Sequence, residues 1–240
     1  MKLRIRHTKL GKIRFTSHRD TARHWERAVR KAQIPLAYSA GFTPRPRMSF
    51  GLALPTGAES LAEYLDIELA EHADVQLDEL PALFSAELPV GYEVTDVVLR
   101  EAGSPSLQED VVACDWELTL EGVTHPELAT AIEVALAAAT MPVERERKGQ
   151  RSTDDVRPAI LHLSAAPPAD DPRPRLCATL ATTGRGLRPV ELLAAMFPTL
   201  DPVDTAARVL RTQQWIERDG VRREIIPADP VAARTPVECA

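Results

Sequence analysis

The order of the predicted elements most constrains the fold, because the same order occurs twice along the chain. Residues 1–100 read as strand, helix, two strands, helix and strand, with an extra strand near the start. Residues 111–226 repeat this order with a second set of strands and helices, in which strands are predicted over 111–120 and 175–181 among others. We therefore expect an α+β protein of two tandem ferredoxin-like (split βαβ) units, each an antiparallel sheet with two helices on one face.

The length of 240 residues accommodates two domains of this size. Residues 101–110, which include Ala-Gly-Ser-Pro-Ser, have the composition of a linker. We expect the N-terminal unit to span 1–100 and the C-terminal unit 111–226. The tail over 227–240 is rich in Pro and Ala and is expected to fray.

The first helix is predicted over residues 17–32. Thr16 and Ser17 offer an N-cap, apolar residues including Trp25 and Ala28 recur at helical spacing, and Pro35 ends the element. Before it, the alternation of apolar and basic residues around Lys9-Leu-Gly-Lys12 predicts a hairpin. Strands are further predicted over 48–54, 63–69 and 92–99, and a helix over 75–87.

Charge is distributed unevenly along the chain. Residues 1–50 hold thirteen Lys or Arg and two acids, whereas residues 51–140 hold one basic residue and nineteen acids, although the formal net charge is only −6. A basic first segment indicates a surface aimed at a polyanion. The alternative is that the basic third neutralises the acidic third within the fold.

Arginines and aromatic residues of the basic segment form the candidate RNA site. Arg19, Arg23 and Arg27 recur every four residues on one helix face, and a proline-stiffened loop carries Arg45. Stacking on aromatic rings combined with phosphate pairing is the usual way to hold single-stranded RNA. The RNA-binding residues are predicted to be Arg14, His18, Arg19, Arg23, Arg27, Phe42, Arg45, Arg47, Phe50, Lys148, Arg151, Arg185 and Arg188.

Catalytic and metal-binding motifs of the common enzyme classes do not occur in the sequence. There is no GxSxG, HExxH, Walker A or GxGxxG, and the six histidines show no ligand spacing. His18 beside Arg14 and Arg19 is the one candidate for metal-free RNA cleavage, with a capping or phosphate-contacting role as the alternative. No catalytic residue and no metal ligand is therefore assigned.

The sequence also predicts where the protein works. No apolar run approaches 18 residues, and the charged start lacks the apolar core of a secretory signal. Three widely spaced cysteines exclude a disulfide framework, and the absence of CxxxCxxC excludes an iron–sulfur cluster of the chain's own. We expect a soluble cytoplasmic protein without a cofactor.

Several motifs are similar to those of the radical-SAM-linked protein family, a bacterial family of uncharacterised function. They are Ser17-His-Arg-Asp20, Tyr38-Ser-x-Gly-Phe-x-Pro-Arg-Pro46 before Ser49-Phe, Leu54-Pro-x-Gly57 before Glu63-Tyr-x-Asp-Ile-Glu-Leu69, Arg157-Pro, and Gly186-Leu-Arg-Pro-x-Glu-Leu-Leu193. Because members are fused to or encoded beside a radical SAM enzyme, the resemblance implies such an enzyme as a partner.

These observations predict a non-catalytic protein that binds RNA and presents it to a partner enzyme. Two alternatives stay open at this point. The chain could be a docking module for the radical SAM enzyme without RNA contact, or a metal-independent RNA endonuclease that uses His18. Salt-dependent RNA binding separates the first alternative from the prediction, and cleavage without metal separates the second.

Overall fold

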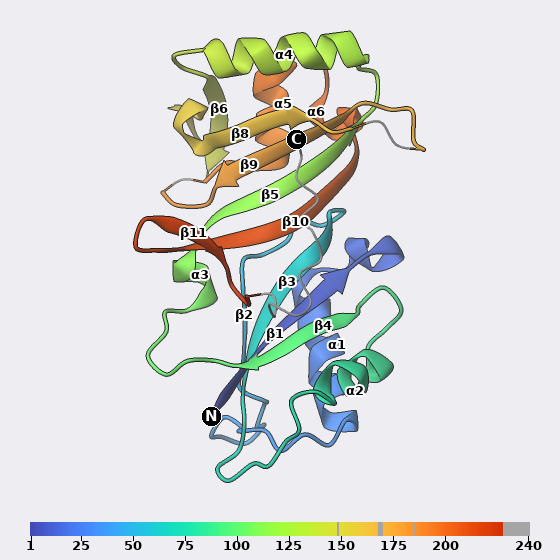
Figure 1. Ribbon diagram of the computed structural model, residues 1–240, viewed down its shortest axis with the longest axis vertical. Helices are drawn as coiled ribbons and strands as arrows, with labels where there is room; N and C mark the ends of the chain where they lie inside the picture. The colour runs from blue at the N-terminus through green and yellow to red at the C-terminus, as the bar shows by residue number, and fades with distance from the viewer. Residues whose placement is uncertain (148, 168–169, 185, 228–240) are drawn as a thin grey trace. The chain divides into compact units, whose positions relative to one another are not determined.

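The computed structural model describes residues 1–147, 149–167, 170–184 and 186–227 (Figure 1). The chain divides into two compact units, Met1–Asp110 and Val111–Ala240. The predicted tail over 227–240 lies, except for Pro227, outside the described residues. None of the helices in the described ranges is long and apolar enough to cross a membrane.

The first unit is a small antiparallel sheet with helices. Its elements are β1 (Lys2–Lys9), η1 (Gly11–Phe15), α1 (His18–Lys31), β2 (Met48–Phe50), β3 (Glu59–Glu68), α2 (Leu80–Glu87), β4 (Val94–Leu99) and α3 (Leu107–Asp110). The strands lie in the order β4-β1-β3, and β2 pairs with β3. All of these pairs are antiparallel.

The core of the first unit lies between one face of this sheet and the helices α1 and α2. Leu3 and Ile5 on β1 stand opposite Ile67 and Leu65 on β3, so the strand register places four apolar side chains on one face. The indole of Trp25 is fully buried in the same core, where it lies 5.8 Å from the Phe84 ring of α2.

Helix α1 begins and ends for local reasons. The Ser17 Oγ accepts a hydrogen bond from the Asp20 amide at 3.2 Å and donates one to the Asp20 carboxylate at 2.7 Å. At the other end, Gln33 takes a positive φ of 53°, and Pro35 follows. The predicted first helix is therefore confirmed within a residue at each end.

The second unit contains β5 (Val111–Leu120), α4 (His125–Ala137), β6 (Pro142–Arg147), β7 (Gln150–Asp155), η2 (Arg157–Ala159), β8 (Ile160–Ala165), β9 (Arg175–Ala181), α5 (Pro189–Met196), α6 (Pro202–Thr205), β10 (Ala206–Arg218) and β11 (Val221–Glu224). Its main sheet has the order β10-β5-β9-β8, and β11 pairs with β10. Strands β6 and β7 form a separate hairpin.

The coarse fold class is confirmed. The described residues contain six α-helices and mostly antiparallel strands, as expected of a mixed α+β protein. The residues predicted as a linker end in a short helix, α3, which belongs to the first unit.

The predicted hairpin around Lys9–Lys12 is wrong. Residues 11–15 form the 3-10 helix η1 instead of a second strand. Strand β1 already has β3 and β4 as its two neighbours, and the Leu10 amide donates to the Gly91 carbonyl at 2.8 Å. No edge of β1 is therefore left to pair with the following residues.

Other predicted elements are shorter than expected or were missed. The strand predicted over 48–54 is limited to β2, and the helix predicted over 75–87 begins only at Leu80. Strands β7 and β11 were not predicted, because their side chains are mostly polar and exposed and carry no apolar alternation.

Candidate functional site

The helix-covered face of the first sheet changes from apolar to polar at one end. Along β1 and β3 the opposed pairs on this face are Leu3–Ile67, Ile5–Leu65 and then His7–Glu63. Lys9 continues the same face of β1, because side chains two residues apart point the same way. His7 is only 2% exposed and Lys9 only 4% exposed, so ionisable side chains replace the core residues here.

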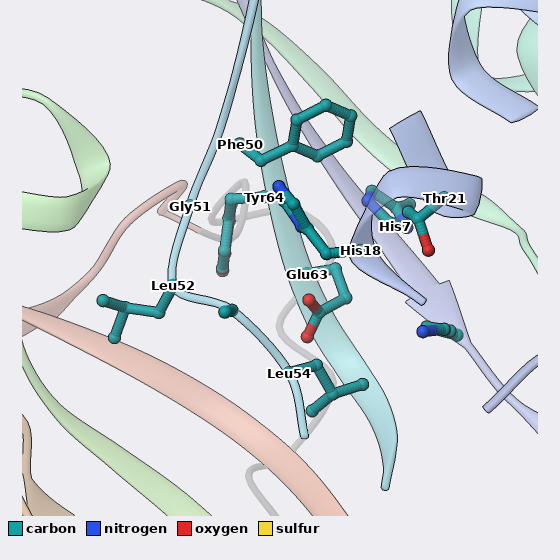
Figure 2. A pocket seen from close by; sticks show the side chains of 11 residues that line it. His7, His18, Thr21, Phe50, Gly51, Leu52, Leu54, Glu63 and Tyr64 are labelled. Carbon is teal, nitrogen blue, oxygen red and sulfur yellow. The ribbon is translucent and has the colours of Figure 1, made fainter. Parts of the chain in front are cut away.

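A small open pocket lies at this polar end, and we call it the α1 pocket. Its empty volume is about 390 Å³ with its open mouth included. The lining comes from β1, the start of α1, β3, the last residue of β2 and the segment that follows it (Figure 2). The lining residues are His7, Lys9, His18, Thr21, Phe50, Gly51, Leu52, Ala53, Leu54, Glu63 and Tyr64.

The imidazole of His7 is held on two sides by aromatic rings. Its centroid lies 4.9 Å from the Trp25 ring and 5.8 Å from the Tyr92 ring. The His7 Nδ1 lies 3.0 Å from the Thr8 carbonyl oxygen. Because a carbonyl only accepts, Nδ1 carries the hydrogen and Nε2 carries the lone pair in the neutral ring.

His18 approaches the pocket from the first position of α1, and its side chain is exposed. Its ring packs edge-on against Phe50, with the centroids 5.2 Å apart. In the view of Figure 2 the His18 ring lies between Phe50 and Glu63. Two residues that the sequence predicted separately, His18 and Phe50, are thus brought together.

The lysine and the threonine of the pocket are fixed by named partners. The Lys9 Nζ donates to the Thr16 carbonyl oxygen at 2.9 Å, which holds the ammonium next to the start of α1. The Thr21 hydroxyl lies 3.1 Å from the hydroxyl of Tyr92. The α1 pocket therefore combines two imidazoles, one ammonium and one carboxylate, a set that can bind a polar ligand and move protons.

His24 lies on α1, within two turns of His18, and its pKa is lowered. Partial burial of the ring is the main cause, and the positive charge of Arg27 adds to it. The pKa of Asp20 is also lowered, chiefly because Ser17 donates a hydrogen bond to its carboxylate. The start of α1 therefore keeps a negative carboxylate among its cationic side chains.

The three arginines predicted to form one face of the first helix all lie on α1 and are exposed. We call Arg19, Arg23 and Arg27 the α1 arginine row. The Arg23 guanidinium is 3.0 Å from the Asp20 carboxylate, in an exposed ion pair. Arg19 directly follows the pocket residue His18 in α1, but its side chain leaves the helix about 100° further round and does not line the pocket.

Two other predicted arginines lie at opposite ends of β3. Arg14 is 3.7 Å from Glu59, and Arg47 is 3.2 Å from Glu68. The two acids are nine positions apart at the two ends of β3, which corresponds to about 30 Å. The thirteen predicted residues therefore do not form a single compact site.

The loop that precedes β2 carries the remaining predicted residues of the first unit. Phe42 is fully exposed, and the Arg45 side chain is exposed as well. Two hydrogen bonds between Ser39 and Arg45 order the loop: the Ser39 amide donates to the Arg45 carbonyl at 2.9 Å, and the Arg45 amide donates to Ser39 Oγ at 3.1 Å. The Phe42 ring and the Arg45 guanidinium are thus both exposed to solvent on an ordered loop.

In the second unit, Arg151 lies on β7 and Arg188 precedes α5, and both are exposed. Lys148 and Arg185 lie outside the described residues. The neighbouring Arg145 is engaged by Glu191 at 2.8 Å and by Asp154 at 3.5 Å. Arg145 therefore serves the packing of this unit.

Sequence reasoning missed His7, Lys9 and Glu63 as pocket residues. The available signal was the period of two in Leu3, Ile5, His7 and Lys9, which places all four on one strand face. That Glu63 joins them depends on the register between β1 and β3, which one sequence does not reveal.

The described part of the chain contains no group of three or more His, Cys, Asp or Glu side chains placed to hold a metal ion. Residues 2–189 match the model of one family, described as "Uncharacterized protein conserved in bacteria (DUF2344)". No curated protein matches the chain.

Proposed function

The chain belongs to the bacterial DUF2344 family, and on that premise we propose that it binds single-stranded RNA and presents it to a partner enzyme. The observation that carries the proposal is the α1 arginine row, three exposed guanidiniums on the helix whose first residue, His18, lines the α1 pocket. Arg19 to Arg27 spans eight residues of helix, about 12 Å, along which an RNA backbone can be held by its phosphates. Arginine suits this role because its planar fork pairs with phosphate oxygens.

The α1 pocket adds aromatic rings on which RNA bases can stack, a contact that the arginine row does not provide. Phe50 and His18 present ring edges and faces at its mouth, and stacking on such rings contributes about 1–3 kcal/mol per base. The exposed Phe42 ring offers a second platform on the loop with Arg45 and Arg47. Aromatic rings among guanidiniums favour single strands over duplexes.

The proposal is tested by measuring RNA affinity against salt for two matched double variants. R19A/R23A removes two charges of the α1 arginine row, and R222A/R223A removes two exposed charges of β11. For the first variant the slope of log affinity against log salt should flatten by about 0.7 per lost phosphate contact, hence by about 1.4. The second variant should keep the wild-type slope. Equal slopes in both variants would overturn the proposal.

We further propose that both units are ferredoxin-like. The strand order β4-β1-β3 with β2 on β3 supports this for the first unit, and β10-β5-β9-β8 supports it for the second. In chain order, one helix follows the first strand of each unit and another helix precedes the fourth strand of the sheet. These are α1 and α2 in the first unit, and α4 and α5 in the second. An experimental structure of either unit with a different strand order would contradict this assignment.

The partner enzyme that we propose, on the resemblance alone, is a radical SAM protein. Exposed apolar side chains on α4, Val134 at 64% and Leu136 at 43%, are available to contact it. The chain should then co-purify with a radical SAM protein, and V134D/L136D should weaken this association without changing RNA affinity. If V134D/L136D still associates with the radical SAM protein as the wild type does, α4 is not the docking surface.

A further inference from the structure

We propose that the α1 pocket cleaves the RNA backbone without a metal ion, by transfer of the phosphodiester to the neighbouring 2′-hydroxyl. The inference rests on the proposed RNA binding and adds an activity to it. Its basis is the convergence of His7, Lys9, His18 and Glu63 from three different elements on one small open pocket. Metal-free phosphoryl transfer from a 2′-hydroxyl needs a base, an acid and a charge stabiliser, and the pocket holds all three.

His7 has the properties of the general base. The hydrogen bond from its Nδ1 to the Thr8 carbonyl sets the tautomer, and contacts with Trp25 and Tyr92 fix the ring plane. The lone pair on Nε2 is therefore the site that accepts a proton. In this orientation a buried histidine needs no rearrangement before it takes the proton of a 2′-hydroxyl.

His18 has the properties of the general acid. Its side chain is exposed at the pocket mouth, where it exchanges protons with water between turnovers. It is the first residue of α1 and directly precedes Arg19, so in this proposal an RNA backbone held at Arg19 passes His18. The leaving oxygen of the scissile phosphate would therefore meet His18 first.

The step balances as follows. The 2′-hydroxyl gives its proton to His7 Nε2, and its oxygen forms a bond to phosphorus. The bond between phosphorus and the 5′-oxygen breaks, and that oxygen takes a proton from His18. The products are a 2′,3′-cyclic phosphate and a 5′-hydroxyl, with no oxidation or reduction. Lys9 stabilises the extra negative charge that develops on the phosphate oxygens.

Glu63 acts as a positioning residue. It faces His7 across the strand pair, and opposed residues in an antiparallel pair have their Cβ atoms about 4.5–5.5 Å apart. A carboxylate at that place stabilises the imidazolium that forms on His7. The other ionisable groups around the pocket and this ring are Lys9 on β1, His18 on α1, the Tyr64 hydroxyl on β3 and the Tyr92 hydroxyl before β4.

The experiment uses the full-length protein with an end-labelled RNA pool of random sequence in buffer with EDTA. We expect fragments that end in a 2′,3′-cyclic phosphate. H18A and H7N should each slow cleavage by about 10²–10⁴-fold. The H7N change keeps a donor for the Thr8 carbonyl and removes the Nε2 lone pair. Binding is measured separately with 2′-deoxy-substituted strands, which bind but lack the nucleophile.

The matched control is H125A, because His125 also occupies the first position of a helix behind a capping residue, Thr124. H125A should cleave at the wild-type rate. E63Q should shift the acid limb of the pH–rate profile to lower pH, a change that a merely structural role would not cause. If H7N fails to fold in a thermal scan, H18A decides the test, since His18 is exposed.

Three results would overturn the activity. These are no cleavage by a wild-type protein that binds the 2′-deoxy strand, cleavage that stops in EDTA, and cleavage by H18A at the wild-type rate. A wild-type protein that binds no strand at all would instead contradict the proposed function and, with it, the activity. Binding and cleavage are therefore judged separately.

Discussion

His7 on β1 and Glu63 on β3 stand directly opposite each other where the helix-covered face of the first sheet changes from apolar to polar. The sheet core thus merges into the α1 pocket without an intervening loop. The strand register places both residues on the helix side, and a slip of one residue would turn one of them to the other face. A site built on paired strands is held more rigidly than one carried by loops.

We predict that the N-cap of α1 supports the site that begins next to it. S17A removes the hydroxyl that caps the Asp20 amide, and loss of such a cap costs about 1 kcal/mol of stability. The pKa of Asp20 should rise toward its ordinary value, because the hydrogen bond from Ser17 is the main cause of its lowering. NMR titration and chemical denaturation check both effects.

The sign of the pH dependence follows from that lowered pKa. A carboxyl whose pKa is lower in the folded state stabilises the fold above its unfolded value, and this contribution disappears as the pH falls through the folded value. S17A should therefore lose less stability than the wild type on acidification. T124A is the matched control: it should raise the pKa of Glu127 in the same way and leave RNA affinity unchanged.

Gly91 is predicted to be essential for the packing of η1. Its φ is +105°, and a Cβ there would collide with the Leu10 carbonyl oxygen and lie 2.8 Å from an Ile13 side-chain carbon. G91A should lose about 1–2 kcal/mol from backbone strain and about 1–3 kcal/mol more from overpacking. G103A is the control, because Gly103 has a φ of +80° but no neighbour within 4 Å of the added Cβ. It should therefore lose stability from backbone strain alone. Equal losses of stability in the two variants would contradict the predicted close approach.

A buried ion pair is predicted to hold the first sheet more strongly than the exposed pair beside it. The Arg4 guanidinium donates twice to the Asp66 carboxylate, at 2.8 and 2.9 Å, and both side chains are buried. D66N leaves a buried charge without its counter-ion and should cost about 3–5 kcal/mol in urea unfolding. E68Q, two residues along β3, breaks an exposed pair with Arg47 and should cost less than about 1 kcal/mol. If D66N and E68Q lower the free energy of unfolding by similar amounts, the Arg4–Asp66 pair contributes little to stability.

The sequence predicted well those elements whose boundaries are set by residues within or next to the element, such as an N-cap, a proline or an apolar pattern. Ser17 and Pro35 bracket α1, and the strands β5 and β9 coincide with the predicted ranges 111–120 and 175–181. The β5 segment has an apolar–polar alternation, and the β9 segment is a nearly continuous apolar run that is buried along most of its length. Where the alternation covers only Ile13 and Phe15, the chain forms η1, because tertiary pairing of β1 decides the outcome.

The site could be predicted only in part. The α1 arginine row was visible because its spacing lies within one helix. The α1 pocket was not, because His7 and Glu63 are 56 positions apart (63 − 7) and meet only through strand register. Phe50 and His18 were both predicted to touch RNA, yet their mutual contact depends on how β2 pairs with β3.

The central claim is that exposed arginines of the first unit hold RNA phosphates. It is tested most directly by the affinity of a single-stranded RNA as a function of salt, for wild type and for R19A/R23A/R45A/R47A. All four side chains are exposed, and the ion pairs that Arg23 and Arg47 make are exposed as well, so the variant should lose little stability. The account predicts weaker binding at low salt and a slope flatter by about 0.7 per contact, hence by about 2.8 for four contacts. Equal affinities and equal slopes would contradict it and assign the basic segment to the fold or to a protein partner.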